Sequence, residues 1–117
     1  MLKLIAFSRC MTCKRARDFL DRRGIDYIER DIISENPTAN ELNEWLEKSG
    51  IDYQNIINTS ASKARELGLK KRLDTITKDE VLSLLSEDGT LIKRPILVGE
   101  DKVLFGFKES DWAAMCN

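Results

Sequence analysis

The chain has 117 residues, a length typical of one domain, and a formal net charge of −1 from 19 Lys and Arg against 20 Asp and Glu. A hydrophobic fraction of 42% is enough for a packed core and excludes a disordered chain. The near-neutral charge argues against broad, sequence-independent binding of nucleic acid, which needs a basic surface. The sequence has no histidine, which excludes Ser–His and Cys–His dyads and histidine metal ligands.

The start of the chain carries no predicted targeting segment. The apolar run Leu2–Phe7 is too short for a secretory signal, and no run approaches the roughly 20 apolar residues of a membrane span. We therefore expect a cytoplasmic protein without membrane contact. Because cytoplasmic thiols stay reduced, a close pair of cysteines is expected to be redox-active or metal-binding, not a permanent disulfide.

The first third predicts a strand, a dithiol, a helix and a second strand. Residues 2–7 are a continuous apolar run typical of a buried strand, and residues 25–32 predict the second strand. Between them, apolar side chains recur at helical spacing up to the stop at Gly24. These apolar positions are Cys13, Ala16, Phe19 and Leu20. The pattern predicts a βαβ unit with two parallel strands.

The middle third, about residues 36–90, predicts a helical insert within a single domain that spans residues 1–117. Two capping boxes, Thr38–Glu41 and Thr77–Glu80, open helices. Short helical turns are expected over 52–57 and 62–67. The basic run Lys70-Lys71-Arg72 is interpreted as a solvated loop, with a contact to a partner or an anion as the alternative.

The last third predicts a hairpin and a terminal helix. Strands are expected over 96–98 and 102–107, with a helix over 108–115. The whole order predicts an α/β fold with a four-stranded mixed sheet, βαβ followed by ββα, and helices on both faces. Trp45 and Trp112 lie on apolar helix faces and are expected to be buried.

The strongest chemical signal is the dithiol Cys10-Met11-Thr12-Cys13 at a strand-to-helix junction. A thiol just before the first helical turn is stabilised as a thiolate by unpaired backbone N–H groups and the helix dipole. The second thiol lies one turn further on, within reach of a mixed disulfide on the first. We therefore interpret Cys10 as the nucleophile and Cys13 as the resolving thiol.

Two other interpretations of the cysteines are open. Half of a zinc site would need two further ligands, and only Cys116 is left, so we expect no metal. A pair of inert structural cysteines is the second alternative. Cys116 itself is expected to be an exposed bystander.

The second signal is Arg94-Pro95 before a short apolar strand. In a thioredoxin-like sheet, a proline at this place follows a cis peptide bond and faces the dithiol. Arg94 would then project toward Cys10 and could hold an anionic substrate or a thiolate. The alternative is a strand-initiating proline beside a solvated arginine.

Several separated motifs resemble one family in order and spacing. The motifs are Cys10–Ala16, Asn58-Thr59-Ser60, Ala64–Leu69, Asp88-Gly89, Leu91–Val98 and Gly106–Glu109. Over nearly its whole length, the chain resembles the arsenate reductase and Spx family.

The resemblance implies a thioredoxin-like fold with a helical insert and a site without a bound cofactor. It implies that Cys10 attacks a small oxyanion or a disulfide and that Arg94 binds the anion. Ser8, Thr12 and Pro95 are implied to contact the substrate. It also implies an external thiol reductant, such as glutathione with glutaredoxin, or thioredoxin.

Two departures separate the chain from the arsenate reductases of this family. Cys13 stands where they carry a serine, and Ser60 stands where they usually carry an arginine, a place that Lys63 or Arg65 could fill. The dithiol is instead similar to that of the Spx regulators, which bind RNA polymerase. The resemblance therefore implies either a thiol–disulfide oxidoreductase or a redox-switched regulator that binds the polymerase α subunit. We expect a monomer that makes no direct contact with nucleic acid.

Overall fold

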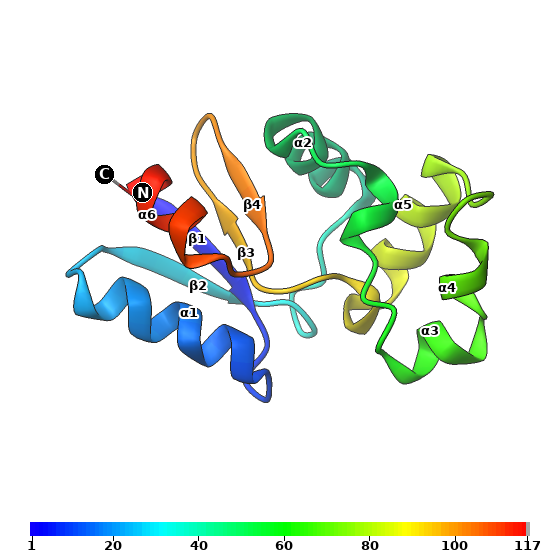
Figure 1. Ribbon diagram of the computed structural model, residues 1–117, viewed down its shortest axis with the longest axis horizontal. Helices are drawn as coiled ribbons and strands as arrows, with labels where there is room; N and C mark the ends of the chain where they lie inside the picture. Colours follow the sequence, from blue (N-terminus) through cyan, green and yellow to red (C-terminus); the bar gives the residue numbers. More distant parts are fainter. Residues whose placement is uncertain (117) are drawn as a thin grey trace.

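The sheet has the mixed four-stranded arrangement predicted from the sequence. The structure is a computed structural model that describes residues 1–116. The strands lie in the order β2-β1-β3-β4 (Figure 1). They are β1 (Leu2–Ala6), β2 (Tyr27–Asp31), β3 (Ile96–Val98) and β4 (Val103–Phe105). β1 is parallel to β2 and antiparallel to β3, and β3 is antiparallel to β4.

Helices occupy both faces of the sheet and the long connection between β2 and β3. The α-helices are α1 (Met11–Arg22), α2 (Ala39–Ser49), α3 (Ser62–Glu66), α4 (Leu69–Arg72), α5 (Lys78–Glu87) and α6 (Glu109–Cys116). Two 3-10 turns, η1 (Tyr53–Ile56) and η2 (Gly89–Leu91), complete the set. Figure 1 shows α2 to α5 gathered beside the sheet, while α1 and α6 lie over it.

Side-chain alternation along β1 divides the core between the two faces. Leu4 and Ala6 point to the face covered by α1 and α6, where Trp112 is fully buried. Ile5 points to the other face, which packs against the insert and includes Trp45. Both tryptophans are therefore core residues, as predicted. The Trp112 indole N–H donates to the Gly106 carbonyl at 3.0 Å, so its one polar atom is satisfied.

The insert begins where the sequence signals place it. The Thr38 hydroxyl accepts from the Glu41 backbone N–H, and the Glu41 carboxylate accepts from the Thr38 N–H, so α2 starts with a complete capping box. Thr77 and Glu80 form the same motif at α5. Gly50 ends α2 in the left-handed conformation, with φ 71°, which a glycine adopts without steric cost.

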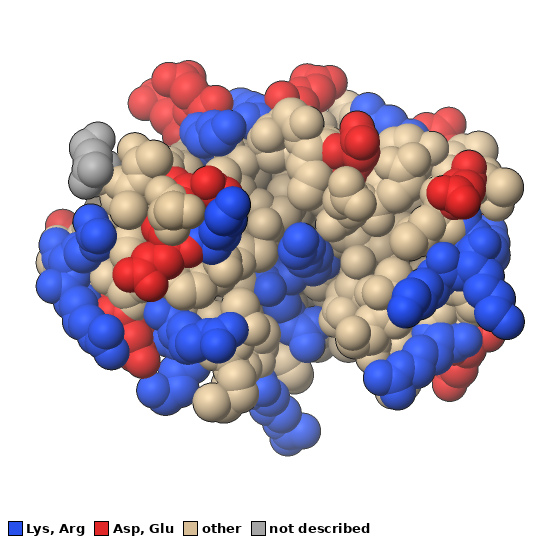
Figure 2. Space-filling model, viewed as in Figure 1, with Lys and Arg blue, Asp and Glu red and all other residues tan. Residues whose placement is uncertain are grey.

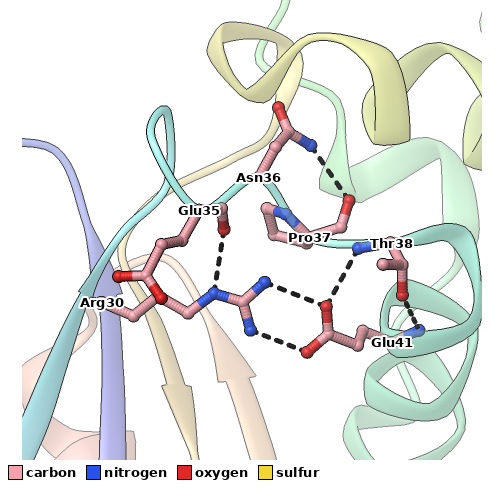
Figure 3. A network of polar contacts seen from close by, with 6 residues as sticks. All are labelled: Arg30, Glu35, Asn36, Pro37, Thr38 and Glu41. Carbon is pink, nitrogen blue, oxygen red and sulfur yellow. Dashed lines mark hydrogen bonds and ion pairs between the residues drawn. The ribbon is translucent and has the colours of Figure 1, made fainter.

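An ion pair fixes the insert to the edge strand of the sheet. Arg30 on β2 donates two hydrogen bonds, at 2.7 and 2.9 Å, to the carboxylate of Glu41 on α2 (Figure 3). The third donor used by Arg30 reaches the Glu35 carbonyl at 2.9 Å. Beside it, the Asn36 amide donates to the carbonyls of Leu85 and Ser86 at the end of α5. The connection after β2 is thus hydrogen-bonded to β2 through Glu35 and to the end of α5 through Asn36.

Three expectations from the sequence were wrong. Lys70-Lys71-Arg72 is not a loop but part of α4, which is anchored by the fully buried Leu69. The strands expected over 25–32 and 102–107 are shorter, because turn and loop residues take up their ends. Cys116 is half-buried, because α6 continues through it and packs it against the core around Trp112. Among the helices of residues 1–116, none has the length and apolar character to cross a membrane.

Candidate functional site

Cys10 lies at the carboxyl end of β1, where the chain turns into α1. It is the N-cap residue, with an extended backbone (φ −93°, ψ 117°), and its N–H donates to the Phe7 carbonyl at 3.1 Å. Its Sγ accepts a hydrogen bond from the Cys13 backbone N–H at 3.3 Å. The thiol therefore occupies the position where a helix stabilises negative charge, and the first turn of α1 holds no acidic residue to oppose it.

The pKa values of the two thiols are shifted in opposite directions. Burial alone would raise the pKa of Cys10, but hydrogen bonds from the Cys13 thiol and N–H, with the hydrogen bond and charge of Arg94, lower it overall. Cys13 is fully buried. Burial, followed by its hydrogen bond to Cys10, raises the pKa of Cys13 to about 12. The hydrogen bond between the two thiols therefore favours the proton on Cys13 and negative charge on the Cys10 sulfur.

Arg94 reaches this pair from the connection before β3. Its peptide bond to Pro95 is cis. The guanidinium lies over the Phe7 ring, 5.2 Å from the centroid, and one terminal nitrogen donates to the Thr90 carbonyl at 3.5 Å. Its Nε is buried and has no hydrogen-bond partner within residues 1–116. A buried donor of this kind is costly to leave unsatisfied.

A groove of about 510 Å³ opens on the side of Arg94 toward the insert. Its lining combines two cations and one acid with small, mostly polar side chains. The lining residues are Asn58, Ser60, Ala61, Ser62, Lys63, Glu66, Thr90 and Arg94. Lys63 thus faces the same groove as Arg94 and Ser60, whereas Arg65 does not line it. Neither this groove nor a larger pocket of about 640 Å³ between α2, β4 and α6 is lined by a cysteine of the dithiol.

The remaining predicted contact residues differ in their exposure to solvent. Ser8 is exposed in the turn before Cys10, and Pro95 is buried. Thr12 is half-buried in the first turn of α1, where its hydroxyl accepts from Arg15 at 3.4 Å. Met11 follows Cys10 in the chain and is 73% exposed, so an apolar side chain is open to solvent between the two cysteines.

Two residues at the site were not singled out from the sequence. Phe7, expected only as the end of a strand, supplies the ring beneath Arg94. Arg17 lies near Cys13, where its charge acts to lower the pKa of that thiol, and it pairs with Glu29 on β2 at 2.7 Å. Both contacts join distant segments, so local spacing could not reveal them. In residues 1–116 no three His, Cys, Asp or Glu side chains are grouped to hold a metal ion.

Known proteins are similar to this chain in sequence and in fold. The ArsC family model matches residues 6–115. The uncharacterised protein YusI of Bacillus subtilis is 42% identical over 91% of this chain and 90% of its own length. The global transcriptional regulator Spx 2 of Bacillus cereus is 29% identical over 95% of this chain and 83% of its own. A crystal structure of an ArsC family related protein from Bacteroides fragilis superposes with a TM-score of 0.93, at 37% identity, over 97% of this chain and 96% of that one.

The match runs from the end of β1 into α6, so it covers the dithiol, the insert and the Arg94 segment together. The thioredoxin-like fold with a helical insert is therefore confirmed, and the chain is a member of the ArsC family.

Proposed function

We propose that the chain is a thiol–disulfide oxidoreductase in which Cys10 is the nucleophile and Cys13 the resolving thiol. The observation that carries the proposal is that the two thiols occupy different environments, which shift their pKa values in opposite directions. Cys10 has a lowered pKa at the start of α1, while burial holds Cys13 as a neutral thiol beside it. A nucleophile must be a thiolate, whereas a resolving thiol acts only after the mixed disulfide has formed.

The reaction then proceeds in two exchanges. The Cys10 thiolate attacks one sulfur of the substrate disulfide, forming a new S–S bond and releasing the other half as a thiolate. Cys13 loses its proton, attacks Cys10 and releases the second half, which takes up a proton. The protein ends with a Cys10–Cys13 disulfide, having given two electrons to the substrate. An external thiol, such as glutathione or a reduced redox protein, restores the dithiol.

Arg94 has two tasks in this scheme. In the resting protein it stabilises the Cys10 thiolate, since its hydrogen bond and charge both lower the pKa of that thiol. During exchange its guanidinium, which lines the groove beside the insert, can bind an anionic group of the substrate. Lys63 is the other cation of the groove, but it has a contact with Glu66 at 3.8 Å, and Ser60 stands where the family's arsenate reductases usually carry an arginine. We therefore expect disulfides to be reduced faster than arsenate.

The test is reduction of bis(2-hydroxyethyl) disulfide with glutathione as the external reductant. We expect turnover by the native chain and no turnover above background by Cys10→Ser. Cys116→Ser is the matched control, because it removes a thiol outside the site and should keep full activity. Turnover by Cys10→Ser at the native rate would refute the proposed mechanism. Arsenate, offered in parallel, should be reduced more slowly than the disulfide.

A second candidate is a redox-switched transcriptional regulator that binds the RNA polymerase α subunit. It is favoured by the similarity to Spx 2, which extends over 95% of this chain. Forming a Cys10–Cys13 disulfide would remove the thiolate beside Arg94 and change the surface at the start of α1. Capture of the C-terminal domain of the α subunit, measured with reduced and with oxidised protein, tests this. Binding that depends on the redox state supports the regulator, and no binding in either state excludes it.

A further inference from the structure

The insert carries a basic surface that the dithiol chemistry does not use. Between Ser62 and Arg72 the sequence has five cations and one acid, although the whole chain has a net charge of −1. We name this surface, which covers α3 and α4, the basic insert surface. Its cations are Lys63, Arg65, Lys70, Lys71 and Arg72. Figure 2 shows Lys and Arg side chains gathered where Figure 1 places α3 and α4.

Few of these charges are neutralised within the described part of the chain. Arg72 pairs with Glu80 at 2.9 Å, and Lys63 has a longer contact of 3.8 Å with Glu66. Arg65, Lys70 and Lys71 are exposed and form no ion pair within residues 1–116. Like charges held close together repel one another, and an acidic partner would relieve that repulsion.

Helix α1 also carries many cations, but acids are interspersed among them. Lys14 pairs with Asp18 at 3.2 Å, and Arg17 pairs with Glu29 at 2.7 Å. Over α1 four cations stand beside two acids, a net charge of +2, whereas residues 62–72 have five cations and one acid, a net charge of +4.

The basic insert surface meets the site at the groove that Arg94 lines. Lys63 on α3 lines the groove that Arg94 also lines, and Arg94 acts directly on the Cys10 thiol. A partner that lies over α3 and α4 would therefore follow the groove toward Cys10. This places the cations where they can guide a substrate toward the reactive sulfur.

Two observations favour an acidic protein over nucleic acid as the partner. Proteins that bind single strands stack bases on exposed aromatic rings, and within residues 1–116 none of the exposed large apolar side chains is aromatic. A duplex is read by an element that fills its groove, whereas α3 and α4 have only five and four residues.

We propose that the basic insert surface docks an acidic protein segment whose cysteine exchanges with Cys10. This inference rests on the proposed oxidoreductase function and specifies its substrate as a protein with acidic residues near the reacting disulfide. The docking step forms no covalent bond. It raises the local concentration of the disulfide at Cys10, and the exchange then follows the two steps given above.

The test uses synthetic peptides of about ten residues, which span roughly 33 Å when extended, compared with 41 Å for the longest axis of the protein. Each peptide carries one cysteine as a mixed disulfide with 2-nitro-5-thiobenzoate. An acidic peptide has several Glu residues, and its matched control has Gln in their place. Attack by Cys10 forms the Cys10–peptide disulfide and releases the coloured thiolate, so the rate is read by absorbance. All proteins carry Cys116→Ser.

The variant Lys70→Glu/Lys71→Glu reverses two exposed charges without touching Cys10, Arg94 or the groove. Lys3→Glu/Lys102→Glu is the matched control, because it makes the same change in net charge at exposed positions on or beside the sheet. At low salt we expect the acidic peptide to react with the Lys70/Lys71 variant about tenfold more slowly than with native protein. The Lys3/Lys102 variant should stay near the native rate, and about 0.5 M salt should abolish the difference.

The possible failures are distinguishable. The docking inference is wrong if the Glu peptide reacts with native protein no faster than the Gln peptide does. It is also wrong if both double variants lower the rate of the Glu peptide equally. In either case the dithiol chemistry stands. If neither peptide reacts, the proposed function fails. Docking is then judged by fluorescence anisotropy with labelled peptides that carry serine for cysteine. Loss of binding in the Lys70/Lys71 variant alone supports docking. Tighter binding of a single-stranded oligonucleotide through the same lysines would overturn the assignment to an acidic protein.

Discussion

Replacing Arg94 should reduce the reactivity of Cys10 at neutral pH without removing the thiol. The guanidinium lowers the pKa of Cys10 through a hydrogen bond and through its charge. A hydrogen bond to a charged group contributes about 1.5–3 kcal/mol. Arg94 is partly exposed, so solvent screening favours the lower end of that range. About 1.4 kcal/mol corresponds to tenfold in the thiolate fraction at a fixed pH below the pKa.

The assay is the rate of alkylation of Cys10 by iodoacetamide as a function of pH, in a Cys116→Ser background. Cys13 does not interfere, because its pKa is raised to about 12. For Arg94→Gln the curve should move to higher pH, with a rate about tenfold lower on its acidic side. Arg94→Lys keeps the charge and should fall between the two. If Arg94→Gln gives the native curve, the helix start and Cys13 alone set the pKa of Cys10, and the assigned role of Arg94 is refuted.

Three further predictions concern the resolving thiol and the fold. Cys13→Ser should trap the Cys10–glutathione mixed disulfide, detected by intact mass, and recovery of the reduced protein at the native rate would argue against Cys13 as the resolving thiol. Glu41→Gln removes the charge that pairs with Arg30 and should lower the free energy of unfolding at pH 7 by about 1 kcal/mol, measured in urea titrations. The loss is no larger because the ion pair is partly exposed and solvent screens it. The Arg30 hydrogen bonds lower the pKa of Glu41 from 4.5 to about 2, so this stability is complete above pH 4.5 and is lost as the pH falls toward 2. The native protein and the Glu41→Gln variant should therefore converge in stability near pH 2, and a constant difference between them would contradict the ion-pair account. Gly89→Ala should lower the melting temperature, since the added Cβ would collide with the Ile32 carbonyl oxygen, and an unchanged melting temperature would contradict that packing.

Patterns that repeat along the chain predicted most of the fold. The period of the apolar residues predicted α1 and the side of it that faces the core, and the two capping boxes placed the starts of α2 and α5. Helix α4 was missed because Lys70–Arg72 has no apolar period of its own. That helix depends on one buried anchor, Leu69, whose partners lie elsewhere in the sequence. Sequence periodicity cannot register a contact of this kind.

The dithiol was identifiable from sequence because its chemistry is local. Both cysteines lie within one turn at a strand-to-helix junction, and the opposite pKa shifts of their thiols follow from that placement together with the burial of Cys13. The position of Arg94 over Phe7 joins residues 87 positions apart, and neither local spacing nor the family resemblance predicted it. The pairing of Arg17 with Glu29 has no sequence signal, because it depends on the register of β2 beside α1.

The central claim is that Cys10 and Cys13 form a working dithiol, and a redox titration tests it most directly. Cys116→Ser protein is equilibrated in glutathione buffers of increasing oxidising strength, and the remaining thiols are alkylated and counted by intact mass. We predict that both thiols are lost together, with a single midpoint and no added glutathione mass. Retention of the Cys13 thiol at every poise, with glutathione attached to Cys10, would contradict the account and assign the chemistry to a single thiol.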